Sequence, residues 1–202
     1  MNLTDNNVNE EGGEAFLEVF KKHSKLEYLN LEATALGEEI TGKDTQEVAE
    51  HCPDLETLIL SANDILREGV DSVAEGIAKM KKLKVLNITD NELGDAGVAK
   101  ICVALQTSAA KLEELDVSCN EISKSGAEAV SKLAATSLKS TIKKVNLDQN
   151  WIQEDAIESI QKIFADAGLD SVLQSLEDND PDGEPDEDEA DEVANLIAKL
   201  MV

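Results

Sequence analysis

The residues that could support catalysis or hold a metal are few in this chain and lie far apart along it. The three cysteines, Cys52, Cys102 and Cys119, fit neither a disulfide framework nor the ligand spacing of a zinc site. The two histidines, His23 and His51, have no nucleophile beside them in the sequence. We therefore expect no catalytic residue, no metal and no cofactor, and hence no active site within this chain.

Carboxylates are the abundant chemical groups. The 202 residues include 43 Asp and Glu against 18 Lys and Arg, which gives a formal net charge of −25. Such a charge disfavours nucleic acid as a partner, because most nucleic-acid affinity comes from basic side chains that neutralise phosphates. Residues 177–192 hold eleven acids and no base, a composition that does not fold by itself. This run is either a solvated tail or a contact for a basic partner, and charge alone leaves both open.

A polar residue recurs at one spacing through most of the chain. Five apolar segments begin at Leu26, Leu55, Leu83, Leu112 and Ile142, so the period is 28 to 30 residues. Each ends three residues before a polar residue, and these are Thr34, Asn63, Asn91, Asn120 and Asn150. A truncated sixth copy opens the chain with Leu3 and Asn6. The pattern is that of the leucine-rich repeat, in which the leucines of a short strand enter the core and Asn satisfies backbone groups where the strand ends.

The residues after each Asn have the spacing of an amphipathic helix. Val70, Val73 and Ile77 share one face of the stretch from Arg67 to Met80, and a small residue such as Gly126 near each helix start allows close packing. One helix per repeat of this length predicts an α/β horseshoe arc of the ribonuclease-inhibitor kind, with parallel strands on the concave side and helices on the convex side. Gly37 to Lys43 interrupts the spacing and is expected to bulge as a loop.

Alternate residues of each strand face the concave side in such an arc, and that face becomes more acidic toward the C-terminus. The candidate partner-binding residues are Glu32, Glu114, Asp116, Asp148 and Trp151. Trp151 follows the last Asn of the series, where it serves either as a cap packed under the acidic tail or as an anchor for a partner.

We divide the chain into a leucine-rich-repeat domain over residues 1–176, a disordered acidic linker over 177–192 and a C-terminal amphipathic helix over 193–202. That helix is either docked on the arc or available to bind a groove. The chain has no apolar run approaching the ~20 residues that span a bilayer, and its polar start differs from a signal peptide. We expect a soluble monomer in the cytoplasm, with the nuclear envelope or nucleus as further locations.

The closing segment carries a family resemblance. Val172-Leu173-Gln174-Ser175-Leu176, followed by acids from Glu177 onward, resembles the C-terminal half of Ran GTPase-activating proteins, and the resemblance covers about residues 1–192. It implies a crescent that binds the small GTPase Ran, accelerates its GTP hydrolysis without inserting an arginine, and acts in nucleocytoplasmic transport.

The resemblance leaves the catalytic part of the family unassigned in this sequence. It places the hydrolysis-promoting residues in the N-terminal half of the family's longer crescent, so no catalytic residue is carried over. The chain resembles a C-terminal portion or a reduced relative of such an activator. The alternative is a non-catalytic interaction scaffold that binds a basic-surfaced protein.

Overall fold

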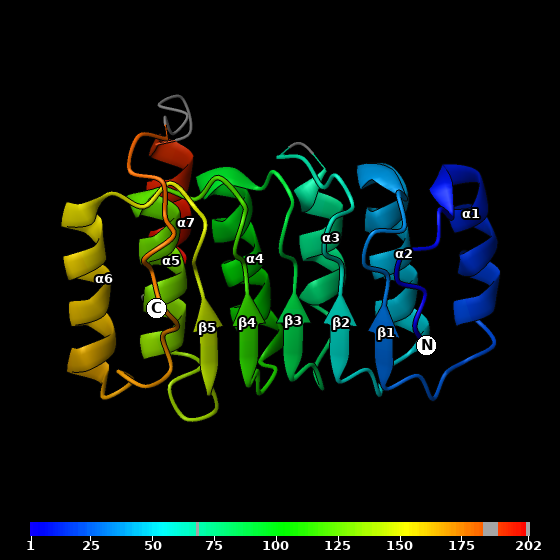
Figure 1. Ribbon diagram of the computed structural model, residues 1–202. Coiled ribbons are helices and arrows are strands. Elements are labelled where there is room, and N and C mark those ends of the chain that lie inside the picture. Colours follow the sequence, from blue (N-terminus) through cyan, green and yellow to red (C-terminus); the bar gives the residue numbers. More distant parts are fainter. Residues whose placement is uncertain (68, 184–189, 201–202) are drawn as a thin grey trace.

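Helix and strand alternate along the chain in the order that the repeats predict. A computed structural model describes residues 1–67, 69–183 and 190–200. The elements are α1 (Asn9–Phe20), β1 (Tyr28–Asn30), α2 (Gly37–His51), β2 (Thr57–Ile59), α3 (Val70–Ile77), β3 (Val85–Asn87), α4 (Gly94–Ser108), β4 (Glu114–Asp116), α5 (Lys124–Ala135), β5 (Lys144–Asn146), α6 (Glu154–Ala167) and α7 (Ala190–Lys199). The strands form one parallel sheet in chain order, and the helices lie behind it (Figure 1). This arrangement confirms the leucine-rich-repeat arc.

The strands pair so that equivalent residues of successive repeats lie side by side. Leu58 pairs with Leu29 on one side and with Leu86 on the other. The central residues are all buried against the helical layer, and they are Leu29, Leu58, Leu86, Leu115 and Val145. Single parallel bridges join Asn2 to Asn30 and Val145 to Leu173. The truncated first copy and the closing segment therefore continue the pairing at the two ends of the sheet.

Buried asparagines satisfy the backbone of the turn that follows each strand. Asn150 is 1% exposed, and its Nδ2 donates to the carbonyls of Val117 (3.2 Å) and Leu147 (2.9 Å). Its Oδ1 accepts the backbone N–H groups of Asn120 (2.8 Å) and Ile122 (3.2 Å). Side chains of the same kind donate to their own and the preceding repeat, and with Asn150 they form the asparagine ladder: Asn63, Asn91 and Asn120. The ladder bonds each repeat to its neighbour as well as closing its own turn.

The prediction of a loop at Gly37 to Lys43 is wrong, because this segment forms the first turns of α2. Gly37 has a φ of 70°, which turns the backbone from the end of the strand segment into the helix. Within the helix, the Thr41 hydroxyl donates to the carbonyl of Gly37 at 2.7 Å. The segment therefore belongs to the helical layer and does not bulge from the arc. The period of this repeat is 29 residues, as in the third repeat, and α2 has the same 15 residues as α4.

The close approach expected at the helix starts is confirmed at Gly126. A Cβ added there would lie 2.6 Å from Asp95 Oδ1 and 2.7 Å from Ile122 Cγ2. The same Asp95 oxygen accepts the backbone N–H of Ser123 at 2.7 Å, just before α5 begins. A glycine at this position leaves room for a carboxylate of one repeat to cap the helix of the next.

One carboxyl is buried in the helical layer, and the sequence analysis did not single it out. Asp44 of α2 is 0% exposed, and neither of its oxygens has a hydrogen-bond partner in the part of the chain that the structure describes. Burial, with a smaller contribution from the nearby Glu47 carboxylate, raises the pKa of Asp44 from 3.8 to about 7. The carboxyl therefore keeps its proton in the folded state over a pH range in which the unfolded chain loses it.

The asparagine ladder predicts that Asn→Ala substitutions at equivalent positions of two repeats lower the free energy of unfolding by different amounts. Asn150→Ala removes a buried amide and leaves several backbone groups unpaired, so the free energy of unfolding should fall by about 2–4 kcal/mol. Asn6 donates to the carbonyls of Leu3 and Thr4 but is exposed. Asn6→Ala should therefore cost less than about 1 kcal/mol, because water replaces its bonds. Urea unfolding of both variants measures the difference, and equal losses would contradict a stabilising ladder.

Asp44 predicts a pH dependence of stability with a definite sign. Below about pH 3 the carboxyl is protonated in both states, so it adds no pH dependence. As the pH rises toward 7, only the unfolded chain releases the proton. The folded state should therefore lose up to about 4 kcal/mol relative to its stability at pH 3. Asp44→Asn, which does not ionise, should lack this loss in urea unfolding measured from pH 3 to 8. Parallel pH profiles of the two proteins would refute the assignment.

Candidate functional site

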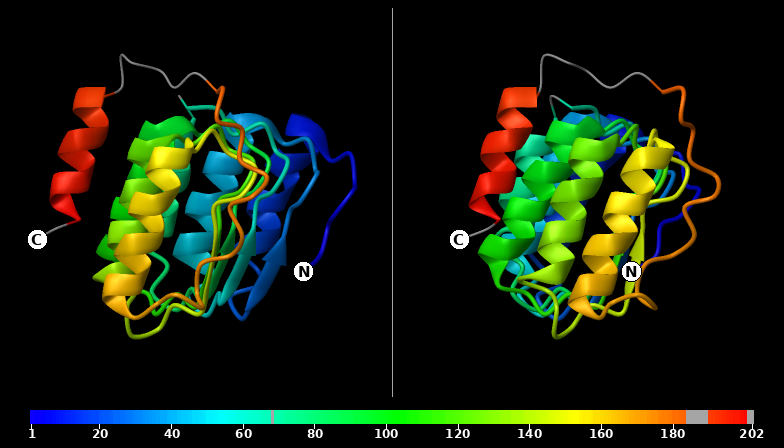
Figure 2. Two further views of the ribbon diagram at one scale, coloured as in Figure 1. Left: turned by 60° about the vertical axis from the view of Figure 1, so that its left-hand side comes forward. Right: turned by 90° about the vertical axis from the view of Figure 1, so that its left-hand side faces the viewer.

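The candidate site is the face of the sheet that points away from the helices. Helices α1 to α6 lie on the opposite face, and α7 lies outside α4 and α5 (Figure 2). The first and third residues of each strand point to the helix-free face, while the middle residue is buried. Two residues per strand, together with the residue two positions after the strand, make up what we call the sheet face.

A repeated hydrogen bond fixes the sheet-face backbone where the strands end. The side-chain oxygens of Asn30, Asn87, Asp116 and Asn146 each accept the backbone N–H two residues later, at 2.8 to 3.2 Å. Ile59 occupies this position in β2, which lacks the bond. The bond restrains the backbone of the residue two positions after the acceptor, such as Glu32 or Asp148, at the edge of the face where the strands end.

Asp116 is the most strongly hydrogen-bonded of the predicted partner-binding residues. Its Oδ1 accepts from the hydroxyls of Thr89 (2.8 Å) and Ser118 (2.7 Å), and its Oδ2 accepts from Asn146 Nδ2 (3.1 Å). Partial burial by itself would raise the pKa of Asp116, but these hydrogen bonds outweigh it and hold the pKa below its usual value. The residue is an ionised link between three strands, and much of its capacity to accept hydrogen bonds is already used.

The structure brings some of the predicted residues together and separates others. Glu114 and Asp116 share β4, and Asp148 follows β5 next to it. Glu114 is exposed, has no ion pair among the described residues and lies beside Lys144 of β5 in the strand register. Glu32 follows β1, with β2 and β3 between it and the others. The acidic group is therefore concentrated at the β4–β5 end.

The first residues of the acidic segment pack on this same end. Asp148 Oδ1 accepts the backbone N–H of Asp178 at 3.1 Å, and the backbone N–H of Asp180 donates to the carbonyl of Asn150 at 2.7 Å. Gly183 lies directly over Trp151, because a Cβ added there would overlap the indole. These contacts favour the interpretation of Trp151 as a cap under the tail, and its role as a partner anchor stays a prediction. Residues 184–189 of the expected linker lie outside the described residues.

Asn179 extends the asparagine ladder by one repeat, which the sequence analysis missed. Its Oδ1 accepts the backbone N–H of Asn150 at 2.9 Å, and its Nδ2 donates to the carbonyl of Leu176 at 3.2 Å. The signal was present in the sequence, since Asn179 stands three residues after Leu176 as in the other repeats. The sequence analysis assigned Asn179 to the acidic linker because acids surround it. The division of the chain at residue 177 stays a prediction.

The cysteines do not contribute a reactive thiolate to this surface. Burial raises the pKa of Cys52, and it raises that of Cys102 to about 12. Cys119 lies at the edge of the sheet face, where its Sγ donates to Gln149 Oε1 at 2.8 Å. Burial and the nearby carboxylates, including Asp116, raise its pKa as well. All three thiols are therefore protonated at neutral pH and are poor nucleophiles.

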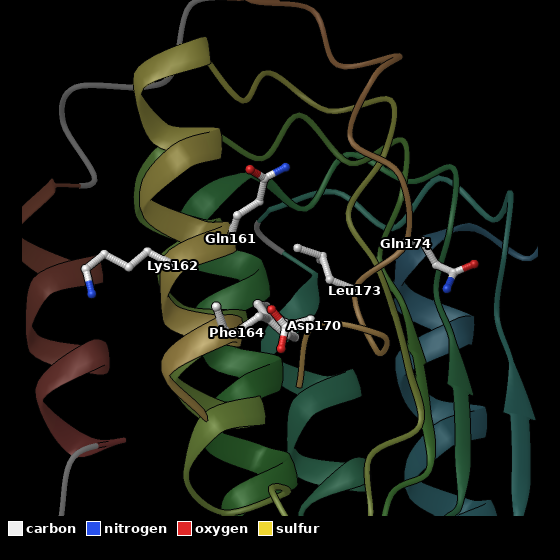
Figure 3. Close-up of a pocket in the computed structure, with 7 residues that line it drawn as sticks. Gln161, Lys162, Phe164, Asp170, Leu173 and Gln174 are labelled. Atoms are coloured by element: carbon white, nitrogen blue, oxygen red, sulfur yellow. The ribbon is translucent and has the colours of Figure 1, made fainter. Parts of the chain in front are cut away.

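A hollow of about 440 Å³ opens at the end of the arc, between α6 and the closing segment. Gln161, Phe164, Leu173 and Gln174 contribute to its lining (Figure 3). Its ionisable groups, Lys162 and Asp170, extend in different directions (Figure 3). The two ionisable side chains of the hollow therefore do not converge on one point. Among the described residues, no group of three potential ligands could hold a metal ion, and no helix is long and apolar enough to cross a membrane.

Comparison with known proteins agrees with the repeat assignment. A family model described as leucine-rich repeat matches residues 79–102 and 108–131. The chain is 17% identical to leiomodin-1 actin-binding site 2, with a TM-score of 0.54 over 78% of this chain and 87% of that one. It is 14% identical to a tropomodulin C-terminal domain from Caenorhabditis elegans, with a TM-score of 0.51 over 81% of this chain and 93% of that one. At these identities the two structures establish the fold alone.

A curated relative supports the resemblance found in the sequence. RAN GTPase-activating protein 2 from Arabidopsis thaliana is 33% identical over 127 residues. That stretch is 63% of this chain and 23% of the relative, so the chain matches about a quarter of the relative's length. The chain is a leucine-rich-repeat protein that is homologous, over these 127 residues, to a Ran GTPase-activating protein.

Proposed function

We propose that this chain binds a Ran-type small GTPase through the β4–β5 end of its sheet face and the adjoining acidic segment, as a GTPase-activating protein or the C-terminal portion of one. The similarity to RAN GTPase-activating protein 2 carries the proposal. We also propose the cytoplasm as its location, with the nuclear envelope or nucleus as further locations.

The distribution of charge supports a basic partner surface. Glu114 is exposed on the sheet face, and residues 177–183, which pack beside β5, contribute further carboxylates. Opposite charge on a partner would raise the association rate, since complementary potentials steer the encounter. Surface charges are screened over about 8 Å at physiological salt, so this attraction should weaken as salt is added.

The contribution to GTP hydrolysis would be electrostatic and indirect. Arg67, the only arginine in the sequence, pairs with Glu121 at 3.1 Å, and its Nε lies close to Gly94. These contacts hold the guanidinium within the turns of the arc, so it is not poised as a finger for a partner's nucleotide. The chain would act on a nucleotide held by its partner, by orienting the GTPase through the sheet face.

The proposal predicts that one charge reversal acts through its position. Glu114→Lys should weaken binding to GTP-loaded Ran by about three- to tenfold at 0.15 M salt, mainly through the association rate. Glu158→Lys makes the same change in net charge on an exposed residue of α6, and it should change the affinity less than twofold. Stopped-flow association at several salt concentrations measures both. Equal effects of the two variants would mean that net charge, and not the sheet face, drives association.

A second assay separates activation from simple binding. In single-turnover GTP hydrolysis by Ran, this chain should accelerate the reaction far less than the ~10⁵ reached by complete activators of small GTPases, because no catalytic residue has been assigned to it. Near-full acceleration would show that the chain carries the whole activating machinery. Binding without any acceleration would favour the scaffold alternative, and the absence of binding would remove Ran as the partner.

A further inference from the structure

Helix α7 lies on the opposite side of the molecule from the sheet face. It runs along the outer side of α4 and α5, so that two helical layers lie behind the sheet there, while no described helix lies outside α6 (Figure 2). The sequence left open whether this helix docks on the arc or remains available to bind a groove. In the structure it is docked, and it begins at Ala190, three residues before the expected boundary.

Apolar side chains and one ion pair hold α7 in place. Val193 and Leu196 of α7 and Leu200 directly after it are 1%, 9% and 1% exposed, and their spacing of three and four residues puts them on one stripe. Ile197 is partly buried as well. In the first turn, Glu192 pairs with Lys100 of α4 at 3.3 Å. Lys100 also pairs with Asp71 of α3 at 3.0 Å, which positions its ammonium group at the edge of the docking surface.

The receiving surface on α4 suits the approach of a helix. Lys100 marks the side of α4 that faces α7, and the residues one turn away on that side are Ala96, Val103 and Ala104. Ala96 and Ala104 are 3% and 5% exposed, and Val103 is partly buried. By contrast, the uncovered α6 buries only the residues that face the core, which are Ala156, Ile160 and Phe164. Small apolar side chains beside a lysine thus form a surface that a short acidic helix can cover.

Docking and folding of α7 are coupled. Ten residues are too few for a stable isolated helix in water, since such helices become even marginal only at about 12–15 residues. Its packing partners are the helices α4 and α5, and it takes no part in the sheet. The helix is therefore a separate cooperative unit that can detach without breaking the repeats.

We propose that the outer surface of α4 and α5 is a binding site for a short acidic amphipathic helix, which α7 occupies within the molecule and which a helix of a partner protein can take over. The sequence of α7 gives the pattern that a partner helix should carry. An acidic residue pairs with Lys100, as Glu192 does, and the next residue is apolar, like Val193. Further apolar residues follow three and seven positions after that first apolar residue. This site and the sheet face lie on opposite sides, so both can be occupied at once. The inference does not depend on Ran as the partner.

Because α7 is covalently attached to the chain, it has an advantage over any partner helix that competes for the surface of α4 and α5. A tethered segment meets its site at an effective concentration on the order of millimolar, so α7 excludes weak competitors. A partner helix gains access when it binds more tightly or when α7 is weakened. Val193→Asp with Leu196→Asp should release α7, because it places two charges in the apolar contact, and it leaves α4 and α5 unchanged.

A labelled peptide with the sequence of residues 190–202 is the probe for the test. By fluorescence anisotropy, the full-length Val193→Asp/Leu196→Asp chain should bind this peptide at least about tenfold more tightly than the wild-type chain does, since its site is vacant. A peptide that carries the same two substitutions is the matched control and should not bind. Lys100→Glu in the released chain should weaken binding, and a Glu192→Lys peptide should restore part of it.

Each outcome supports or overturns the proposal. Equal binding of the peptide by the wild-type and released chains, or indifference to Lys100→Glu, would overturn it. Light scattering that finds a dimer of the wild-type chain, lost on release of α7, would make a second copy the occupant and overturn the partner assignment. If the released chain fails to fold, hydrogen exchange on the wild-type chain decides. Excess peptide should speed exchange in α7 and leave α4 protected, and unchanged exchange in α7 would refute the competition.

Discussion

The buried amide of the asparagine ladder is the interaction on which the rest of the structure depends. Every repeat must turn from strand to helix inside the protein, where unpaired backbone groups are costly. Asn150 meets this demand by donating to two repeats and accepting from the turn before it. Because each ladder residue bonds to its neighbour, the strands stay in register and the same strand positions face outward in every repeat. The sheet face and the outer surface of the helical layer both follow from that register.

Those surfaces differ in what fixes their side chains. On the sheet face, Asp116 is held by hydroxyl and amide donors from three strands, whereas Glu114 two residues earlier is exposed. Asp116 therefore stabilises the face, whereas the side chain of Glu114 stays exposed. The alternation of strand residues in the sequence does not distinguish the two. On the outer side, α4 presents small residues and Lys100 to α7, whose ten residues are too few for a stable isolated helix. One surface is thus preformed and the other is coupled to folding.

The repeat register was predictable from the sequence, because leucine and asparagine positions recur and each has a local physical reason. What could not be predicted depends on long-range packing. Gly37 to Lys43 departs in sequence from the helical pattern of the other repeats, yet in the packed structure it forms the first turns of α2. Asp44 looks like an ordinary helix carboxylate until the packed structure buries it. The stripe of Val193, Leu196 and Leu200 was visible, but its docking partner lies about ninety residues earlier in the chain. Within the candidate site, the positions of the acids were predicted, whereas the internal hydrogen bonds of Asp116 were not.

The most direct test of the central claim, that the β4–β5 end of the sheet face is the partner surface, is hydrogen exchange of the chain with and without GTP-loaded Ran. The account predicts slower exchange on binding in the turns after these strands, at residues 117–121 and 147–151, with little change in the helices α2 and α3. Slowing confined to the outer helices, with those turns unaffected, would contradict it.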